Sequence, residues 1–322
     1  MMRSRFLGLL SALLAVATVL AGCGGDVAPR SLVKPRPADR PMPAGVHLDP
    51  EVPEAESGSD CGDPTASLAP RGLTIPPGST MEKIRKRGRL IAGVDQNTYL
   101  FGFRNPTTGE LEGFDIDIVR EIAEKLLGDR NKVQFKALPT SKRMDALKDG
   151  SVDLVAYTMT VTCDRRKEAE FSSVYFESGQ RILVPKGSDY TEVSDLGNKP
   201  VCVPAGSTSL VNLAKMSPPP DLVAVDDLAD CLLLLQQRQV EAVSTDDSVL
   251  AGMARQDPSV HVVGEPFSKE PYAIGIPKKN TDMVRYVNAV LEEIRKDSWD
   301  DIYHRWLEPA LGPATPPAAK YK

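Results

Sequence analysis

Two residues of opposite charge stand out because each has the chemistry to bind one end of a small charged molecule. Arg165 carries a guanidinium, whose planar fork offers two parallel hydrogen-bond donors that match the two oxygens of a carboxylate. Asp246 follows the apolar segment 240–243, and its carboxylate can pair with a cation. Taken alone, Arg165 is more simply one partner of a surface salt bridge in the charged run 164–168, and Asp246 an exposed turn carboxylate.

The composition excludes several other kinds of site. The chain has 322 residues and a formal net charge of −5, whereas a protein that coats nucleic acid needs a dense basic surface. Its three histidines lie far apart and no C-x-x-C pair is present, so the sequence predicts no metal site. The G-x-S-x-G, P-loop and G-x-G-x-x-G motifs are missing as well. We therefore expect a protein without a cofactor that is not an enzyme.

Strands and helices alternate from residue 81 onward. Ile118, Ile122 and Leu126 repeat at every fourth position, which predicts the apolar face of a helix that Asp115 or Asp117 is expected to cap. Short apolar segments predict strands at 89–94, 133–137, 152–156, 200–203, 240–244 and 260–263, and further helices are predicted at 144–148 and 228–237. This alternation is typical of an α/β fold with mostly parallel strands, in which ligands bind at the carboxyl ends of the strands.

Four motifs, in order along the chain, resemble those of one protein family. Segment 113–118 (GFDIDI) resembles the signature of polar amino-acid-binding proteins, and 158–165 (TMTVTCDR) resembles their T-x-T-x-x-R stretch. Segment 201–209 (VCVPAGSTS) resembles a strand and loop of the family, and 299–306 (WDDIYHRW) its closing helix. The resemblance spans residues 82–310 and is to family 3 of the bacterial extracellular solute-binding proteins, which includes glutamine, glutamate and arginine binders of ABC importers.

The resemblance implies a periplasmic-binding-protein-like fold of type II, in which two α/β lobes are joined by two crossover strands. Lobe 1 would comprise residues 81–178 and 270–311, and lobe 2 residues 179–269, with the crossings near 177–181 and 269–272. The ligand would lie between the lobes, which close on it because it gains its second set of contacts only when they meet.

By the same resemblance, a zwitterionic amino acid is held by residues of both lobes. Arg165 would bind the α-carboxylate, with help from the hydroxyl of Thr160, and Asp246 would bind the α-ammonium. Ser207 and Thr208 follow a predicted strand and are expected to present backbone amides to the same carboxylate. Further candidates for the cleft are Thr158, Asp95 and Asn97.

The side-chain end of the ligand depends on less certain matches. Arg143 aligns with an element of binders of acidic amino acids and would meet a carboxylate or amide, with Lys142 nearby; the alternative is a basic helix start in solvent. Lys142 stands where the family has Asn, Pro204 where glutamine binders have Lys, and Thr140 where the family has an aromatic residue. These departures favour glutamate or aspartate over glutamine or asparagine, and disfavour a cationic ligand.

The N-terminal residues predict export and a lipid anchor. Two arginines precede the apolar run 6–21, and the following L-A-G-C resembles a bacterial lipobox. We therefore expect a signal peptide at 1–22, lipid attachment at Cys23 and a location on the extracytoplasmic face of the cell membrane; a buried N-terminal helix is the alternative. Residues 23–80 are rich in proline and predict a tether, and 312–322 predict a disordered tail.

The other four cysteines are even in number, which favours disulfides in an exported chain but allows three pairings. With the lobes that the resemblance implies, Cys202 and Cys231 fall together in lobe 2, so Cys61 and Cys163 remain as the second pair. Free buried thiols are the alternative.

The function implied by the resemblance is that of a monomeric binding protein that delivers glutamate, aspartate or their amides to an ABC permease. Two alternatives remain open at the level of sequence. The same cleft could report ligand status to a membrane receptor, or the scaffold could carry a dehydratase, although the sequence has no obvious proton donor for that reaction. A structural protein of the envelope is a third alternative.

Overall fold

The computed structural model describes residues 41–52 and 61–322. The predicted signal peptide and the lipid-bearing Cys23 therefore lie outside the described residues. Within the two described ranges, no helix is both long enough and apolar enough to cross a membrane.

Lobe 1 is built on a five-stranded sheet with the order β6-β2-β7-β16-β8. Strand β2 is parallel to both β6 and β7, whereas β16 is antiparallel to its neighbours. The strands are β2 (Leu90–Val94), β6 (Val133–Ala137), β7 (Leu154–Val155), β8 (Ala169–Phe171) and β16 (Gly275–Pro277), with a smaller sheet of β3 (Asn97–Thr98), β4 (Gly102–Arg104) and β5 (Leu111–Glu112) beside them.

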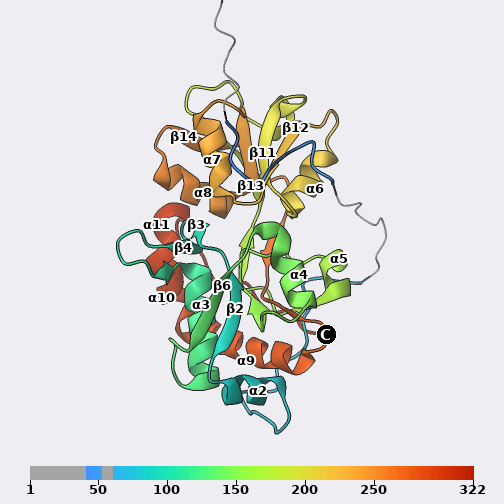
Figure 1. The fold of residues 1–322 in the computed structure, drawn as a ribbon, viewed down its shortest axis with the longest axis vertical. Coiled ribbons are helices and arrows are strands. Elements are labelled where there is room, and N and C mark those ends of the chain that lie inside the picture. Colours follow the sequence, from blue (N-terminus) through green and yellow to red (C-terminus); the bar gives the residue numbers. More distant parts are fainter. Residues whose placement is uncertain (1–40, 53–60) are drawn as a thin grey trace, which may run out of the picture. The chain divides into compact units, whose positions relative to one another are not determined.

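Helices cover both faces of this sheet because side chains alternate along each strand. Ala92 and Val94 of β2 belong to the core cluster of α3 and α9, whereas Ile91 packs with Leu147 of α4 in a second cluster. The helices of lobe 1 are α2 (Thr80–Arg87), α3 (Phe114–Leu127), α4 (Arg143–Lys148), α5 (Cys163–Glu168), α9 (Thr281–Asp297), α10 (Trp299–Trp306) and α11 (Glu308–Leu311), and a 3₁₀ turn, Thr140–Lys142, leads into α4 (Figure 1).

The expectation that Asp115 or Asp117 caps α3 is wrong. Gly113 occupies the N-cap position with no side-chain hydrogen bond to the helix. Asp115 instead accepts hydrogen bonds from Thr158 N and Tyr175 OH, and Asp117 accepts them from Arg305 and Trp306. Both carboxylates therefore connect α3 to other elements rather than capping it.

Lobe 2 contains a six-stranded sheet with the order β1-β12-β11-β13-β10-β14. Its centre is parallel, and β1, β10 and β14 pair antiparallel. The strands are β1 (Val46–Leu48), β10 (Gln180–Pro185), β11 (Pro200–Pro204), β12 (Asp221–Val225), β13 (Ala242–Asp246) and β14 (Val260–Val263).

Alternation along β11 separates two cores in lobe 2. Cys202 packs with residues of α7 and α8, whereas Val201 and Val203 pack with residues of α6, so these helices cover opposite faces of the sheet (Figure 1). The helices are α6 (Thr208–Ala214), α7 (Ala229–Gln236) and α8 (Asp247–Gln256), with a 3₁₀ turn at Val193–Leu196.

Two antiparallel strands, β9 (Phe176–Ser178) and β15 (Glu270–Tyr272), form the connection between the lobes. They overlap the two segments in which the resemblance places the crossings. The predicted fold class, two α/β lobes joined by two crossover strands, is confirmed.

Both predicted disulfides are present. Cys202 of β11 is bonded to Cys231 of α7 within the core of lobe 2. Cys61 is bonded to Cys163, the first residue of α5, and so attaches the segment before lobe 1 to that helix.

The described residues at both ends of the folded part differ from the predicted tether and disordered tail. β1 pairs with β12, and Leu68, Leu73 and Ile75 pack against the core of lobe 1. In the tail, Lys322 N donates to Ser67 O at 2.8 Å, and Ser67 N donates to Lys320 O at 2.9 Å. Proline favours an extended backbone but does not prevent apolar neighbours from packing or backbone groups from pairing, which is why composition alone misjudged both segments.

Candidate functional site

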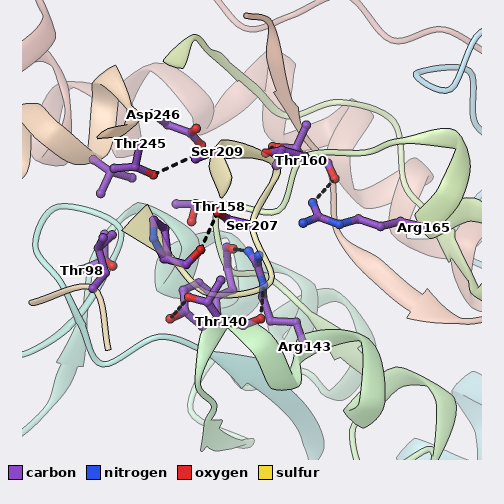
Figure 2. Close-up of a pocket in the computed structure, with 15 residues that line it drawn as sticks. Thr98, Thr140, Arg143, Thr158, Thr160, Arg165, Ser207, Ser209, Thr245 and Asp246 are labelled. Atoms are coloured by element: carbon purple, nitrogen blue, oxygen red, sulfur yellow. Dashed lines mark hydrogen bonds between the residues drawn. The ribbon is translucent and has the colours of Figure 1, made fainter. Parts of the chain in front are cut away.

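A cavity lies between the lobes, where several strands end. Lobe 1 supplies residues that follow β2, β6 and β7, and lobe 2 supplies residues at the ends of β11 and β13 (Figure 2). The lining residues are Thr98, Thr140, Arg143, Tyr157, Thr158, Thr160, Arg165, Pro204, Ser207, Thr208, Ser209, Leu228, Thr245, Asp246 and Val249.

Arg165 enters the cavity from α5, whose N-cap is Thr162. Its Nη1 donates to Thr160 O at 2.6 Å, and its Nη2 donates across to Gly206 O of lobe 2 at 3.3 Å. Gly206 has a φ of +68°, and a Cβ there would lie 2.9 Å from Ser141 Cα, so only glycine fits this approach of the lobes without strain. Desolvation, and then the neighbouring Arg143, lowers the pKa of Arg165 to about 9, which leaves it charged at neutral pH.

Asp246 is the last residue of β13 and is buried. Its Oδ2 accepts a hydrogen bond of 2.5 Å from the hydroxyl of Tyr272, on the crossover strand β15. Its Oδ1 is buried and has no hydrogen-bond partner among the described residues. Burial, followed by the nearby charge of Glu270, raises the pKa of Asp246 to about 8. The free oxygen is thus an acceptor that a cation in the cavity would satisfy.

Arg143 is the first residue of α4 and is buried in the wall of lobe 1. Its Nε donates to Thr140 O at 2.9 Å and its Nη1 to Tyr157 O at 3.0 Å, and the guanidinium lies 5.1 Å from the centre of the Tyr157 ring. Burial lowers the pKa of Arg143, whereas Tyr157 and Asp246 act in the opposite direction. The alternative of a basic residue in solvent is therefore wrong for Arg143.

Thr158 adopts a left-handed backbone conformation, with a φ of +39°, which is unusual for a β-branched residue. Its backbone N–H donates to Asp115 Oδ2 at 2.8 Å, and Asp115 Oδ1 accepts 2.7 Å from Tyr175 OH. Burial raises the pKa of Asp115 to about 7. Asp115 thus holds the loop that carries Thr158 and Thr160 into the cavity.

Ser207 and Thr208 lie at the start of α6. The Ser207 hydroxyl accepts from Leu210 N at 3.1 Å and donates to Pro204 O at 2.6 Å, so it is occupied as the helix cap. The Thr208 hydroxyl donates to Glu270 Oε2 at 2.7 Å. Both residues line the cavity, but neither hydroxyl is without a partner.

Three predicted residues do not line this cavity. Asp95 is buried and accepts hydrogen bonds from the N–H groups of Gln96 and Asn97 and from the hydroxyl of Thr98. It therefore positions Thr98, which does line the cavity. Asn97 is exposed and donates to Asp227 across the lobes. Lys142 is also exposed and pairs with Asp145 at 3.2 Å.

Sequence reasoning missed part of the wall. Tyr157, Ser209 and Thr245 follow or precede residues that the motifs identify, and their polarity next to a strand end was the available signal. The residues Leu228 and Val249 belong to helix starts whose apolar positions are typical of a core, so no signal marked them. Thr140 and Pro204 were recognised only as departures from the family, and both line the cavity.

Comparisons with known proteins agree with this architecture. The sequence pattern of the bacterial extracellular solute-binding proteins, family 3, matches residues 90–309. The glutamine-binding protein GlnH of an ABC transporter of Bacillus subtilis is 38% identical over 71% of this chain and 85% of its own length. A glutamine-binding protein of Geobacillus stearothermophilus is 45% identical over 62% of this chain and 77% of its own.

Solved structures share the fold. An ancestral arginine-binding protein bound to glutamine is 38% identical, with a TM-score of 0.65 over 70% of this chain and 99% of its own. Because the family pattern covers more than half of its length and fold and sequence agree, the chain belongs to the bacterial extracellular solute-binding proteins, family 3.

Proposed function

We propose that the cavity binds one small polar amino acid, glutamate or aspartate ahead of their amides, for uptake by an ABC importer. The observation that carries this proposal is the pairing of opposite charges in one cavity: Arg165 on the wall of lobe 1 and the unpartnered Oδ1 of Asp246 on the wall of lobe 2. A zwitterion satisfies both, because its carboxylate pairs with the guanidinium and its ammonium with the carboxylate.

The preference for an acidic side chain rests on Arg143. Its guanidinium is buried in the same wall as the half-buried Arg165, and a ligand with two carboxylates gives each arginine an anionic partner. A cationic side chain would add a third positive charge and is disfavoured. Two relatives are named as glutamine-binding proteins, so glutamine is the main competing candidate for the ligand.

Closure of the lobes supplies specificity. Arg143, Thr160 and Arg165 come from lobe 1, whereas Thr208 and Asp246 come from lobe 2. A ligand that contacts both sets favours the closed arrangement by its differential affinity. With about ten heavy atoms, micromolar affinity requires about −0.8 kcal/mol per atom, which is within the range for small ligands.

The predicted signal peptide and the predicted lipid attachment at Cys23 support a location on the extracytoplasmic face of the cell membrane, where the protein would act as a monomer that hands its ligand to a permease. The relative named as part of an ABC transporter supports this assignment. A membrane receptor that reads the closed form is the alternative. Uptake of labelled glutamate in a deletion strain separates the two, because only the importer role predicts its loss.

A thermal-shift screen against the twenty amino acids tests the binding function, because a ligand that binds only the native state raises Tm. We expect the largest shift with L-glutamate or L-aspartate, smaller shifts with the amides and none with L-arginine. Calorimetry on the best ligand should then give one site per chain. The absence of a shift with any amino acid would reject the proposal.

A further inference from the structure

Glu270, the first residue of the crossover strand β15, is a buried carboxylate that four donors surround. Its Oε2 accepts from Thr160 Oγ1 at 2.6 Å and from Thr208 Oγ1 at 2.7 Å. Its Oε1 accepts from Ser268 Oγ at 2.5 Å and from Asn212 Nδ2 at 3.2 Å. The carboxylate is therefore fully used by the protein and does not itself line the cavity.

The two threonines on Oε2 come from opposite lobes. Thr160 lies in the loop before α5 of lobe 1, and Thr208 is the first residue of α6 in lobe 2. Both line the cavity, and their hydroxyl oxygens lie 3.5 Å apart. A single oxygen of Glu270 thus connects the two walls of the cavity, at the end of β15 that adjoins lobe 2.

An ionised carboxylate has no hydrogen to donate, so each threonine must donate its only hydroxyl hydrogen to Glu270. The oxygen of each hydroxyl is left with lone pairs and no hydrogen for any other partner. We propose that Glu270 is a positioning residue that turns the hydroxyls of Thr160 and Thr208 into acceptors, so that they favour a ligand ammonium and cannot donate to a ligand carboxylate. This inference rests on the proposed function and revises the role expected for the Thr160 hydroxyl.

The charges around this cluster agree with that role. Glu270 acts on the charged groups of both walls, since its negative charge favours the charged form of Arg165 and disfavours that of Asp246. A ligand ammonium would therefore lie near two acceptor hydroxyls, the free oxygen of Asp246 and a second carboxylate behind them.

The variant Glu270→Gln tests the inference with almost no change in volume. If the amide nitrogen faces the threonines, their hydroxyls must accept from it; if it faces Asn212 and Ser268 instead, the Asn212 amide loses one of its two acceptors and keeps Gln180 Oε1. Glu177→Gln is the matched control, because Glu177 is an exposed carboxylate on the partner strand β9. The probes are L-glutamate and 2-oxoglutarate, which keeps both carboxylates but has no ammonium.

In calorimetry, Glu270→Gln should weaken binding of L-glutamate by about tenfold or more and change that of 2-oxoglutarate by less than about threefold. Glu177→Gln should leave both unchanged. An equal loss for both probes means that Glu270 serves only the structure, and no loss for either means that it does not act on the ligand; each result overturns the inference while leaving amino-acid binding intact.

A double-mutant cycle gives an independent readout if 2-oxoglutarate binds too weakly to the unaltered protein. Thr160→Val removes the hydroxyl and keeps the shape of the side chain. If Glu270 acts through that hydroxyl, Glu270→Gln should weaken L-glutamate binding much less in the Thr160→Val background than in the unaltered protein. Additive effects overturn the inference. Failure of the unaltered protein to bind any amino acid overturns the proposed function itself.

Discussion

The two walls of the cavity carry ionisable groups whose charged forms have opposite signs, and burial affects these groups differently. In lobe 1, burial lowers the pKa of Arg165 only to about 9, so its guanidinium is still charged at neutral pH. In lobe 2, burial and Glu270 raise the pKa of Asp246 to about 8, so its carboxyl is mostly protonated at neutral pH until a cation arrives. The wall of lobe 1 is thus ready for an anion, whereas the wall of lobe 2 becomes charged only together with its ligand.

The walls also differ in how they are supported. The helix that carries Arg165 is attached from outside the lobe, by the Cys61–Cys163 disulfide and by a 2.6 Å hydrogen bond from Arg166 Nε to Pro64 O. Asp246 is supported from the crossover ribbon, through Tyr272. The position of Arg165 therefore depends on a segment far away in the sequence. The position of Asp246 depends on β15, one of the two strands that connect the lobes.

Removing the charge of lobe 1 should have the largest effect. We expect Arg165→Ala to weaken L-glutamate binding by about a hundredfold or more, because it leaves a buried ligand carboxylate without its charged donor. Lys167→Ala, on the exposed side of the same helix, is the control and should stay within about twofold. Calorimetry measures both, and near-normal affinity of Arg165→Ala would remove this residue from the site.

Removing the charge of lobe 2 should have a somewhat smaller effect. Asp246→Asn keeps the shape and the acceptor oxygen but cannot become negative, so we expect a loss of about thirtyfold. Titration in buffers of different ionisation enthalpy should show proton release by the unaltered protein at pH 7 and none by the variant. Equal proton release by both would show that Asp246 is not the group that ionises.

The raised pKa of Asp246 predicts how affinity changes with pH. A ligand ammonium lowers this pKa, so below about pH 8 binding must displace a proton. Affinity for L-glutamate should therefore increase from pH 6 to pH 8, by at most about tenfold per pH unit, and level off above pH 8. In Asp246→Asn the slope should vanish. A slope of the opposite sign would contradict the assignment.

Closure of the walls can be impaired without touching either charge. Gly252 of α8 lies so close to lobe 1 that a Cβ there would be 2.6 Å from Tyr99 O. We expect Gly252→Ala to weaken ligand binding by about tenfold, because the lobes cannot fully meet. Small-angle scattering should show less compaction with ligand than in the unaltered protein.

The Tm measured without ligand is the control for Gly252→Ala. Alanine favours a helix more than glycine does, so the substitution itself should not destabilise α8. The Tm without ligand should therefore not fall far. A large drop in Tm would show that the variant damages lobe 2 instead of its closure.

The two disulfides should separate binding from stability, with the smallest effect on affinity. Replacing Cys61 and Cys163 by serine should lower Tm and weaken binding by about threefold to tenfold, because α5 loses one support while Arg165 keeps its hydrogen bonds. Replacing Cys202 and Cys231 should lower Tm and leave affinity within about twofold, because that pair lies in the core of lobe 2. A larger loss of affinity after replacement of Cys202 and Cys231 than after replacement of Cys61 and Cys163 would show that the outer disulfide does not support Arg165.

Much of the fold could be predicted from local patterns and the family resemblance. The strand at 133–137 and the helix around Ile118 carry clear periodicity, and the structure has both. The packing of segments 61–80 and 312–322 could not be predicted, because proline-rich composition indicates an extended backbone but neither the surface on which Leu68 packs nor the segment with which Tyr321 pairs.

The site shows the same limit. The matched stretch 158–165 identifies Thr158, Thr160 and Arg165 because these residues are close in sequence, and the structure places all three at the cavity. Glu270 is distant from every motif residue that it contacts, and a lone glutamate beside a proline has no pattern that reveals it. The exposure of Lys142 depends on the direction in which α4 starts, which the sequence does not encode in a recognisable form.

A crystal structure of the protein grown with L-glutamate would test the central claim most directly. We predict that the α-carboxylate lies within about 3.2 Å of the guanidinium of Arg165, and that the ammonium lies at a similar distance from Oδ1 of Asp246, with the second carboxylate toward Arg143. A ligand that leaves Asp246 Oδ1 unpaired, or that lies outside the cavity between the lobes, would contradict it.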